Sequence, residues 1–196
     1  MTLAEVLRLV ISRLDELQVP YMVVGSFASS AYGLLRSTYD ADIVVDLQRE
    51  NVREFMETFG HDFYVDAGQV EQAITRKQSF NTIHLGTFFK VDFFVLSDAA
   101  FAREQFSRRV LGPVGAEGGG KVSVATPEDV LLSKLRWYRD GGEVSELQWR
   151  DVIGILKAQS PRLDRQYLRR WATELKVGDL LERATREAGP SGGAPS

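Results

Sequence analysis

Two aspartates one residue apart follow a Gly-Ser pair in the first quarter of this 196-residue chain. Gly25-Ser26 comes directly after the apolar run Tyr21–Val24, and Asp40 and Asp42 open a second apolar run. Residues at i and i+2 of a strand point to one face, roughly 7 Å apart, so Asp40 and Asp42 can reach the same cation. A Gly-Ser turn from a strand into a helix supplies backbone N–H groups that suit a phosphate. The pattern predicts a strand–helix–strand unit that binds a metal and a phosphorylated ligand.

A third carboxylate, Asp92, lies inside the apolar segment Phe88–Leu96. A charge within such a strand needs a partner or a bound ion. Lys90 shares its strand face, so an ion pair with Lys90 and ligation of a metal are the two alternatives. We favour ligation, because carboxylates from neighbouring strands form the oxygen-rich kind of site that Mg²⁺ prefers.

Strand-like and helix-like patterns alternate up to about residue 125. Apolar residues at helical spacing over 3–17 predict the first helix. Apolar runs predict strands at 21–24, 41–47, 79–85 and 88–96, with the last two forming a hairpin, and short strands on either side of a Gly-rich tip at 115–120. We expect the 41–47 strand to be buried on both faces, because of its density of apolar residues.

Helical patterns fill the chain after Thr126, in four segments. The order predicts an α+β protein, in which a small mixed β-sheet with flanking helices precedes a C-terminal helical lobe. The expected ranges are 1–125 for the core and 126–188 for the lobe. Residues 189–196, rich in Gly, Pro and Ser, predict a disordered tail.

Composition excludes some kinds of chemistry and indicates the compartment in which the protein works. The chain has no cysteine, which excludes disulfides, thiolate zinc sites and a cysteine nucleophile. No apolar run approaches the roughly 20 residues of a membrane span, and the N-terminus lacks the pattern of a signal peptide. We therefore expect a cytoplasmic protein that makes no contact with a membrane.

Charge is unevenly distributed, although the net charge is only −3. The C-terminal part is rich in basic residues, among them Arg162, Arg165, Arg169 and Arg170. A solvated helix face is the preferred interpretation of these arginines, and contact with RNA is the alternative. The sequence also lacks the glycine-rich motifs of P-loop and Rossmann nucleotide-binding proteins.

The acidic motif resembles the signature of the DNA polymerase β-type nucleotidyltransferase superfamily. In that signature a Gly-Gly or Gly-Ser pair precedes an acidic-apolar-acidic-apolar strand, and a third acid lies on a later strand. The matching residues are Gly25-Ser26, Asp40-Ala41-Asp42-Ile43 and Asp92. Arg36 to Asp42 is similar to the Arg-x-Thr-x-Asp-x-Asp of minimal bacterial and archaeal members, which include abortive-infection toxins and relatives of antibiotic nucleotidyltransferases.

The resemblance implies a magnesium-dependent transfer of a nucleoside monophosphate from a nucleoside triphosphate, such as ATP, to an acceptor hydroxyl. Two Mg²⁺ ions held by Asp40, Asp42 and Asp92 would bind the triphosphate, which rests on Gly25 and Ser26. Arg36 and Thr38 are also carried over. Arg36 would hold a phosphate or the acceptor, and Thr38 would orient Asp40 or its loop.

A lysine in the helical lobe is the last candidate. The segment Ala125–Leu135 has the features of a helix start, and Lys134 falls near its apolar face. Either Lys134 extends its ammonium to solvent, or it contacts the nucleotide phosphates, as in family members that follow it with Arg and Asp on the next helix, here Arg150 and Asp151. The short Gly141-Gly142 loop predicts antiparallel helices, with Lys134 and Asp151 at the same level.

Several questions stay open at this point. The acceptor hydroxyl could belong to RNA such as tRNA, to a protein or to a small molecule. The same residues suit a toxin, a resistance enzyme and a housekeeping enzyme, and they do not specify the preferred nucleotide or an oligomeric state. The alternative function is a catalytically inactive nucleotide-binding or complex-forming protein with the same fold.

Overall fold

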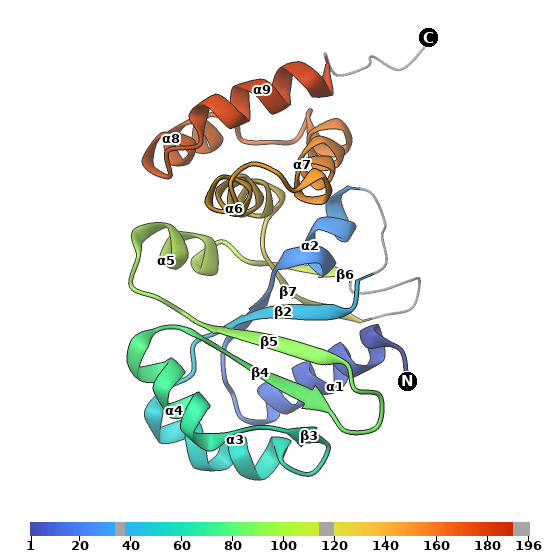
Figure 1. Cartoon of the computed structure of the whole chain (residues 1–196), viewed down its shortest axis with the longest axis vertical. Helices are drawn as coiled ribbons and strands as arrows, with labels where there is room; N and C mark the ends of the chain where they lie inside the picture. Colours follow the sequence, from blue (N-terminus) through green and yellow to red (C-terminus); the bar gives the residue numbers. More distant parts are fainter. Residues whose placement is uncertain (34–37, 114–119, 190–196) are drawn as a thin grey trace. The chain divides into compact units, whose positions relative to one another are not determined.

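A computed structural model describes residues 1–33, 38–113 and 120–189 (Figure 1). Arg36, most of the Gly-rich tip at 115–120 and the tail beyond Gly189 lie outside the described residues. The chain divides into two compact units, Met1–Phe27 with Ser37–Ala125 and Ala28–Arg36 with Thr126–Ser196. Among the described helices, none has the length and apolar character needed to cross a bilayer.

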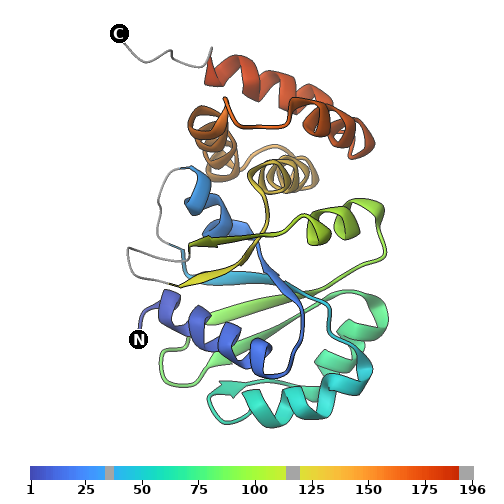
Figure 2. The same cartoon turned by 180° about the vertical axis from the view of Figure 1, so that it is seen from behind.

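The first unit contains a mixed sheet whose seven described strands follow the order β3-β4-β5-β2-β1-β7-β6 (Figures 1 and 2). Strand β2 is parallel to β5 and β1 is parallel to β7, whereas all other neighbours are antiparallel. The strands are β1 (Tyr21–Val23), β2 (Asp40–Val45), β3 (Phe63–Tyr64), β4 (Ser79–His84), β5 (Lys90–Val95), β6 (Val110–Pro113) and β7 (Lys121–Val124). The α+β class and the β4–β5 hairpin are confirmed.

Helices in this unit pack on the sheet through apolar and aromatic side chains. They are α1 (Leu3–Glu16), the 3-10 helix η1 (Arg49–Asn51), α3 (Val52–Phe59), α4 (Ala67–Arg76) and α5 (Ala100–Ser107). Thr2 and Glu5 form a capping box at the start of α1. In the core, Phe55 of α3 meets Phe80 of β4 and Phe93 of β5 edge to face, with ring centroids 5.7 Å apart in both pairs.

Strand β2 is buried on one face only, so the expectation of burial on both faces is wrong. Ala41, Ile43 and Val45 are fully buried, whereas Asp40, Asp42 and Val44 on the other face are partly exposed. The reason lies in the two aspartates, since a strand that presents two carboxylates on one face keeps that face accessible to water or a ligand. This accessible face is where the candidate site lies.

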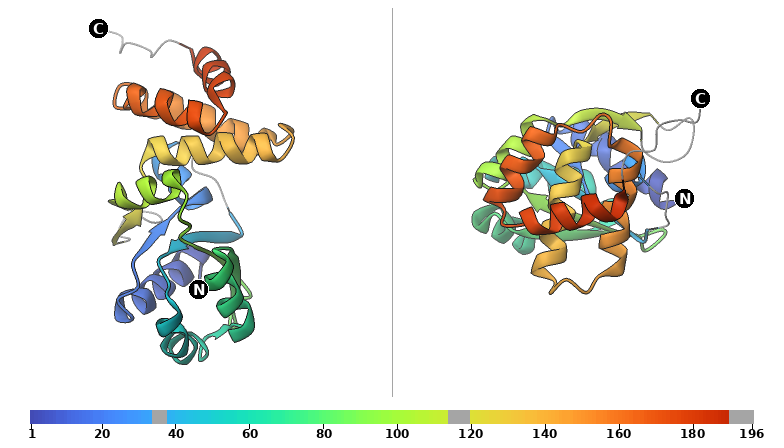
Figure 3. Two further views of the ribbon diagram at one scale, coloured as in Figure 1. Left: turned by 90° about the vertical axis from the view of Figure 1, so that its left-hand side faces the viewer. Right: turned by 90° about the horizontal axis from the view of Figure 1, so that it is seen from above.

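The second unit is helical, and the four predicted C-terminal helices are confirmed (Figure 3). They are α6 (Pro127–Asp140), α7 (Glu146–Gln159), α8 (Arg165–Glu174) and α9 (Gly178–Ala188), and the end of α2 (Gly25–Tyr32) also belongs to this unit. Tyr167 Oη donates to Asp129 Oδ1 at 2.6 Å, and Asp164 N donates to Glu128 Oε1 at 2.9 Å. These bonds join the start of α8 to the start of α6.

Candidate functional site

Three carboxylates come together on the accessible face of the sheet. In the parallel pairing of β2 with β5, Asp42 lies opposite Asp92 and Asp40 lies opposite Lys90. Neighbouring strands run about 4.8 Å apart, and residues in register point to the same face. The structure therefore brings Asp40, Asp42 and Asp92 into one patch, with Lys90 at its edge.

Lys90 interacts with all three carboxylates from the edge of this patch. Its Nζ lies 2.6 Å from Asp92 Oδ2, while the Asp92 side chain is largely buried. The hydrogen bond that Lys90 donates to Asp92 is the main reason that the pKa of Lys90 is raised, and the charges of Asp92, Asp40 and Asp42 add to it. One ammonium thus lies in the field of all three carboxylates. The ion pair between Lys90 and Asp92 is present, and ligation of a metal by Asp92 stays a prediction.

Gly25 brings the start of α2 against one of these carboxylates. Its φ is +62°, and a Cβ at this position would overlap Asp42 Oδ2 and lie 2.7 Å from Asp42 Cγ. Val24 N also donates to the Asp42 carbonyl oxygen at 2.9 Å. Helix α2 begins at Gly25, so Ser26 lies in its first turn. The carboxylate and the positive end of the helix therefore share one small region.

Thr38 holds the first carboxylate in place. Thr38 Oγ1 donates to Asp40 Oδ1 at 2.9 Å and lies 3.2 Å from the Asp40 carbonyl oxygen. A hydroxyl that binds both the side chain and the backbone of Asp40 limits the rotation of its carboxylate. This is the contact expected of a residue that orients Asp40. Whether Thr38 also touches a nucleotide stays a prediction.

Lys134 and Asp151 form a buried pair in the second unit. Lys134 Nζ lies 2.7 Å from Asp151 Oδ2 and 3.1 Å from Gln148 Oε1, and Lys134 is only 1% exposed. The antiparallel arrangement of α6 and α7 and the common level of the two residues are thereby confirmed. The alternative in which Lys134 extends its ammonium to solvent is wrong, because the ammonium binds Asp151 and Gln148 inside the unit.

Gln148 is the residue that the sequence did not single out. It lies one turn before Asp151 on α7, so both side chains leave the same helix face. Two oxygen acceptors on that face satisfy two of the three donors of a lysine ammonium. The i, i+3 spacing of Gln148 and Asp151 was the available signal.

The donor chemistry of the cluster suits Mg²⁺, because all three carboxylates offer hard oxygen ligands. The arrangement itself is not that of a formed metal centre. Within the described ranges, no group of three or more His, Asp or Glu side chains is placed so that it could hold a metal ion. In this structure one of the three carboxylates, that of Asp92, is paired with the Lys90 ammonium.

Comparison with known proteins places the fold in a class. No family model matches this chain, and no curated protein is similar in sequence. An antigenic nucleotidyltransferase-like protein from Paracoccidioides brasiliensis has a similar structure, with a TM-score of 0.55 and 17% identity over 93% of this chain and 91% of that chain. The fold of this chain is therefore that of a nucleotidyltransferase-like protein.

Two antibiotic-related proteins are similar as well. The antibiotic-resistance factor ANT(2″)-Ia gives a TM-score of 0.51 and 14% identity over 94% of this chain and 91% of that chain. The lincosamide antibiotic adenylyltransferase LnuA, bound to lincomycin, gives a TM-score of 0.48 and 13% identity over 79% of this chain and 96% of that chain. At 14% identity, the likeness to ANT(2″)-Ia describes a common architecture only.

Proposed function

We propose that this protein transfers a nucleoside monophosphate from a nucleoside triphosphate to an acceptor hydroxyl. The observation that carries the proposal is the close approach of Gly25 to the Asp42 carboxylate. It joins a helix start suited to phosphate to a cluster of carboxylates suited to Mg²⁺. A nucleoside triphosphate complexed with Mg²⁺ carries phosphate groups for the helix start and a metal ion for the carboxylates.

The start of α2 would receive the triphosphate. The first backbone N–H groups of a helix lack intrahelical acceptors, and they point along the positive end of the helix dipole. Glycine at position 25 leaves room for the Asp42 carboxylate beside this backbone, so a metal ion held by Asp42 would lie next to the bound phosphates. Ser26, in the same turn, places a hydroxyl beside this region.

Asp40, Asp42 and Asp92 would hold the two metal ions. Bound there, Mg²⁺ would neutralise charge on the leaving pyrophosphate and lower the pKa of the acceptor hydroxyl. Thr38 would keep Asp40 oriented toward that position. Asp92, on the strand next to Asp42, would help to remove the proton from the attacking oxygen.

Lys134, Asp151 and Arg36 are further residues proposed to act on the nucleotide. Lys134 would offset triphosphate charge, with Asp151 fixing its ammonium at 2.7 Å. Arg36 would contribute a guanidinium for a phosphate or the acceptor. For the acceptor, RNA, a protein and a small molecule remain the candidates, and a toxin-type activity is one version of this proposal.

One observation favours the second candidate function, a catalytically inactive nucleotide-binding or complex-forming protein. The Lys90–Asp92 ion pair satisfies a carboxylate that the reaction requires. In an inactive protein this pair would persist when the nucleotide binds. In an active one, Lys90 would leave Asp92 as metal binds.

Transfer of label from α-³²P nucleoside triphosphates tests both candidates. ATP, CTP, GTP and UTP would each be incubated with Mg²⁺ and a cell extract, and label would be followed into RNA, protein and small molecules. We expect wild-type protein to transfer label and Asp42→Asn to lose it. Asp98→Asn is the matched control, since Asp98 is exposed and pairs with Arg103 instead. Equal label from wild type and Asp42→Asn would contradict the proposed activity, whereas nucleotide binding without transfer would support the inactive alternative.

A further inference from the structure

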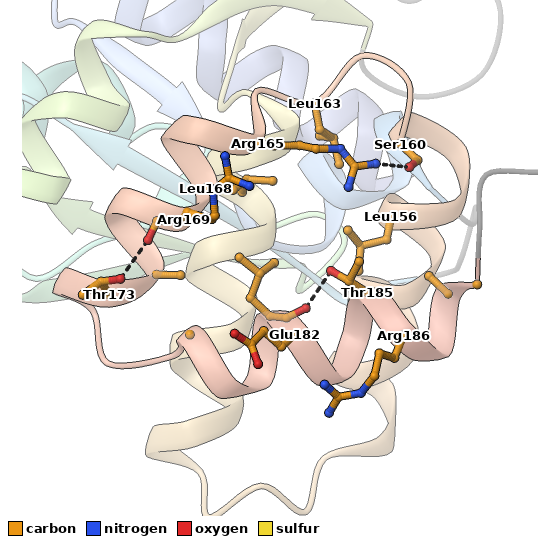
Figure 4. A pocket seen from close by; sticks show the side chains of 15 residues that line it. Leu156, Ser160, Leu163, Arg165, Leu168, Arg169, Thr173, Glu182, Thr185 and Arg186 are labelled. Atoms are coloured by element: carbon orange, nitrogen blue, oxygen red, sulfur yellow. Dashed lines mark hydrogen bonds between the residues drawn. The ribbon is translucent and has the colours of Figure 1, made fainter.

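The helical unit contains a pocket of its own, formed by α7, α8 and α9 (Figure 4). Its volume is about 740 Å³. The apolar part of its wall includes Leu156, Leu163, Leu168, Ala172 and Leu181. Pockets of roughly 300–1,000 Å³ with apolar walls are the usual sites for single small molecules. None of the residues proposed for nucleotidyl transfer lines it.

Two arginines at the start of α8 line the pocket without a carboxylate partner. Arg165 and Arg169 are one helical turn apart, and in the described part of the chain neither forms an ion pair. Arg165 donates to Ser160 Oγ at 3.1 Å, a neutral acceptor (Figure 4). On the α9 side, Glu182 and Arg186 carry opposite charges that balance one another. The pocket therefore has an excess of positive charge, which comes from α8.

Arg165 and Arg169 repel one another weakly, because both residues are exposed and solvent screens their charges. Like charges at i and i+4 of a helix repel one another. Arg165 is also the first residue of α8, where the helix dipole favours a negative charge. An anion between the two guanidinium groups would relieve both effects and would accept charge-assisted hydrogen bonds.

We propose that this pocket binds a small molecule with one anionic group and an apolar body. Its carboxylate, sulfonate or phosphate would bind Arg165 and Arg169, and its hydrocarbon or aromatic part would pack against the leucines of α7, α8 and α9. Arg165 and Arg169 are both exposed, as expected of a solvated helix face, and the proposal adds an anionic ligand to that face. It does not depend on the proposed nucleotidyl transfer, because the site uses other residues.

A pair of matched fluorescent probes tests the proposal. The anionic probe is 8-anilinonaphthalene-1-sulfonate, and N-phenyl-1-naphthylamine is the same molecule without its sulfonate. We expect one sulfonate probe to bind per folded chain and decanoate to displace it. The neutral probe would bind more weakly, because only the apolar walls would hold it.

Substitutions then locate the site. Arg165→Gln with Arg169→Gln would weaken binding of the sulfonate probe by about tenfold or more, because charge-assisted bonds are lost, and would leave the neutral probe unchanged. Arg136→Gln with Arg162→Gln changes the net charge equally but lies outside the pocket lining. Thr185→Trp, at an exposed lining position, would obstruct the pocket and weaken both probes.

Three results would overturn the proposal. The first is that the sulfonate probe binds the Arg165→Gln, Arg169→Gln double variant as tightly as it binds the Arg136→Gln, Arg162→Gln double variant. The second is absence of binding to wild-type protein whose cooperative thermal unfolding shows that it is folded. The third is displacement of the probe by RNA but not by decanoate, which would make the α8 arginines a nucleic-acid contact.

Discussion

Sixteen residues lie between Gly25 and Asp42 in the sequence, yet the Asp42 carboxylate occupies the space that a side chain at residue 25 would need. The contact joins the start of α2 to strand β2, and the hydrogen bond from Val24 N to the Asp42 carbonyl oxygen fixes the backbones at the same level. Asp42 also lies beside Asp92 on the neighbouring strand β5. The contact of Gly25 with Asp42 therefore connects the phosphate-binding and metal-binding parts of the proposed site.

Gly25→Ala is expected to damage both folding and transfer. The added Cβ would displace the Asp42 carboxylate, and its φ of +62° disfavours any side chain. We expect a loss of about 1–3 kcal/mol in the free energy of unfolding and a fall in nucleotidyl transfer of about a hundredfold or more. Denaturant unfolding and label transfer are the measurements. Gly120→Ala is the control, because its Cβ would meet nothing within 4 Å, and equal effects of the two substitutions would contradict the role of the contact.

Lys90→Met is expected to increase the affinity for divalent metal. The Lys90 ammonium binds Asp92 at 2.6 Å and lies in the field of Asp40 and Asp42, so it competes with a cation for all three carboxylates. A Mn²⁺ titration followed by electron paramagnetic resonance would show a several-fold gain in affinity, without reference to turnover. Lys121→Met, an exposed lysine on β7, should leave the affinity unchanged. Weaker Mn²⁺ binding by Lys90→Met would mean that Lys90 supports the metal site.

The common location of the three carboxylates could be predicted because it follows from local rules. Alternation along a strand puts Asp40 and Asp42 on one face, and a parallel neighbour adds Asp92 at the same level. The contact of Gly25 with Asp42 could not be predicted, since it depends on where α2 leaves β1. Burial of the Lys134 ammonium was equally inaccessible, because helical periodicity places the residue near the apolar face without naming its partner on α7.

The one-sided burial of β2 could not be predicted either, because it also depends on how elements pack in three dimensions. An apolar run cannot tell whether a second layer covers both faces, and here the face with the aspartates stays partly exposed. Strand β3 was missed for a different reason, as two residues are too few to form a pattern.

Lys134→Met is expected to destabilise the helical unit by about 3–5 kcal/mol, because it leaves Asp151 buried without its cation. Adding Asp151→Leu should restore most of this stability, since an apolar pair replaces the ion pair. Denaturant unfolding measures both effects. Arg139→Gln serves as a comparison and should cost much less stability, because its pair with Asp179 is exposed and screened by solvent.

The same double variant separates the two roles of Lys134. If the lysine contacts the triphosphate, the stable double variant will show a raised KM for the nucleotide. Recovery of stability and of KM together would mean that the Lys134–Asp151 pair is purely structural.

Phe88→Gly is expected to stabilise the protein by about 1 kcal/mol, because glycine adopts left-handed backbone angles without strain. Phe88 has a φ of +59° at the β4–β5 turn, where its N–H donates to the His84 carbonyl oxygen at 2.8 Å. Its side chain is 81% exposed, so little packing would be lost. Phe88→Ala removes the ring but keeps the strain, and it should gain much less in thermal unfolding. Similar gains for both variants would attribute the effect to the ring instead.

Tyr32 is expected to make the folded protein sensitive to alkaline pH. Burial raises its pKa to about 12, and the charges of Glu128 and Asp129 act in the same direction. The folded state therefore keeps the phenolic proton at a pH where the unfolded chain, with a pKa of 10.0, releases it. The stabilising contribution is complete below pH 10 and is lost as the pH rises toward 12, since the unfolded state then binds fewer protons.

Denaturant unfolding between pH 10 and pH 12 tests this expectation. Tyr32→Phe should lose less stability over this interval than the wild type. Tyr64→Phe, at a largely exposed position, should show the same slope of stability against pH as the wild type. Identical slopes for wild type and Tyr32→Phe would contradict the assignment.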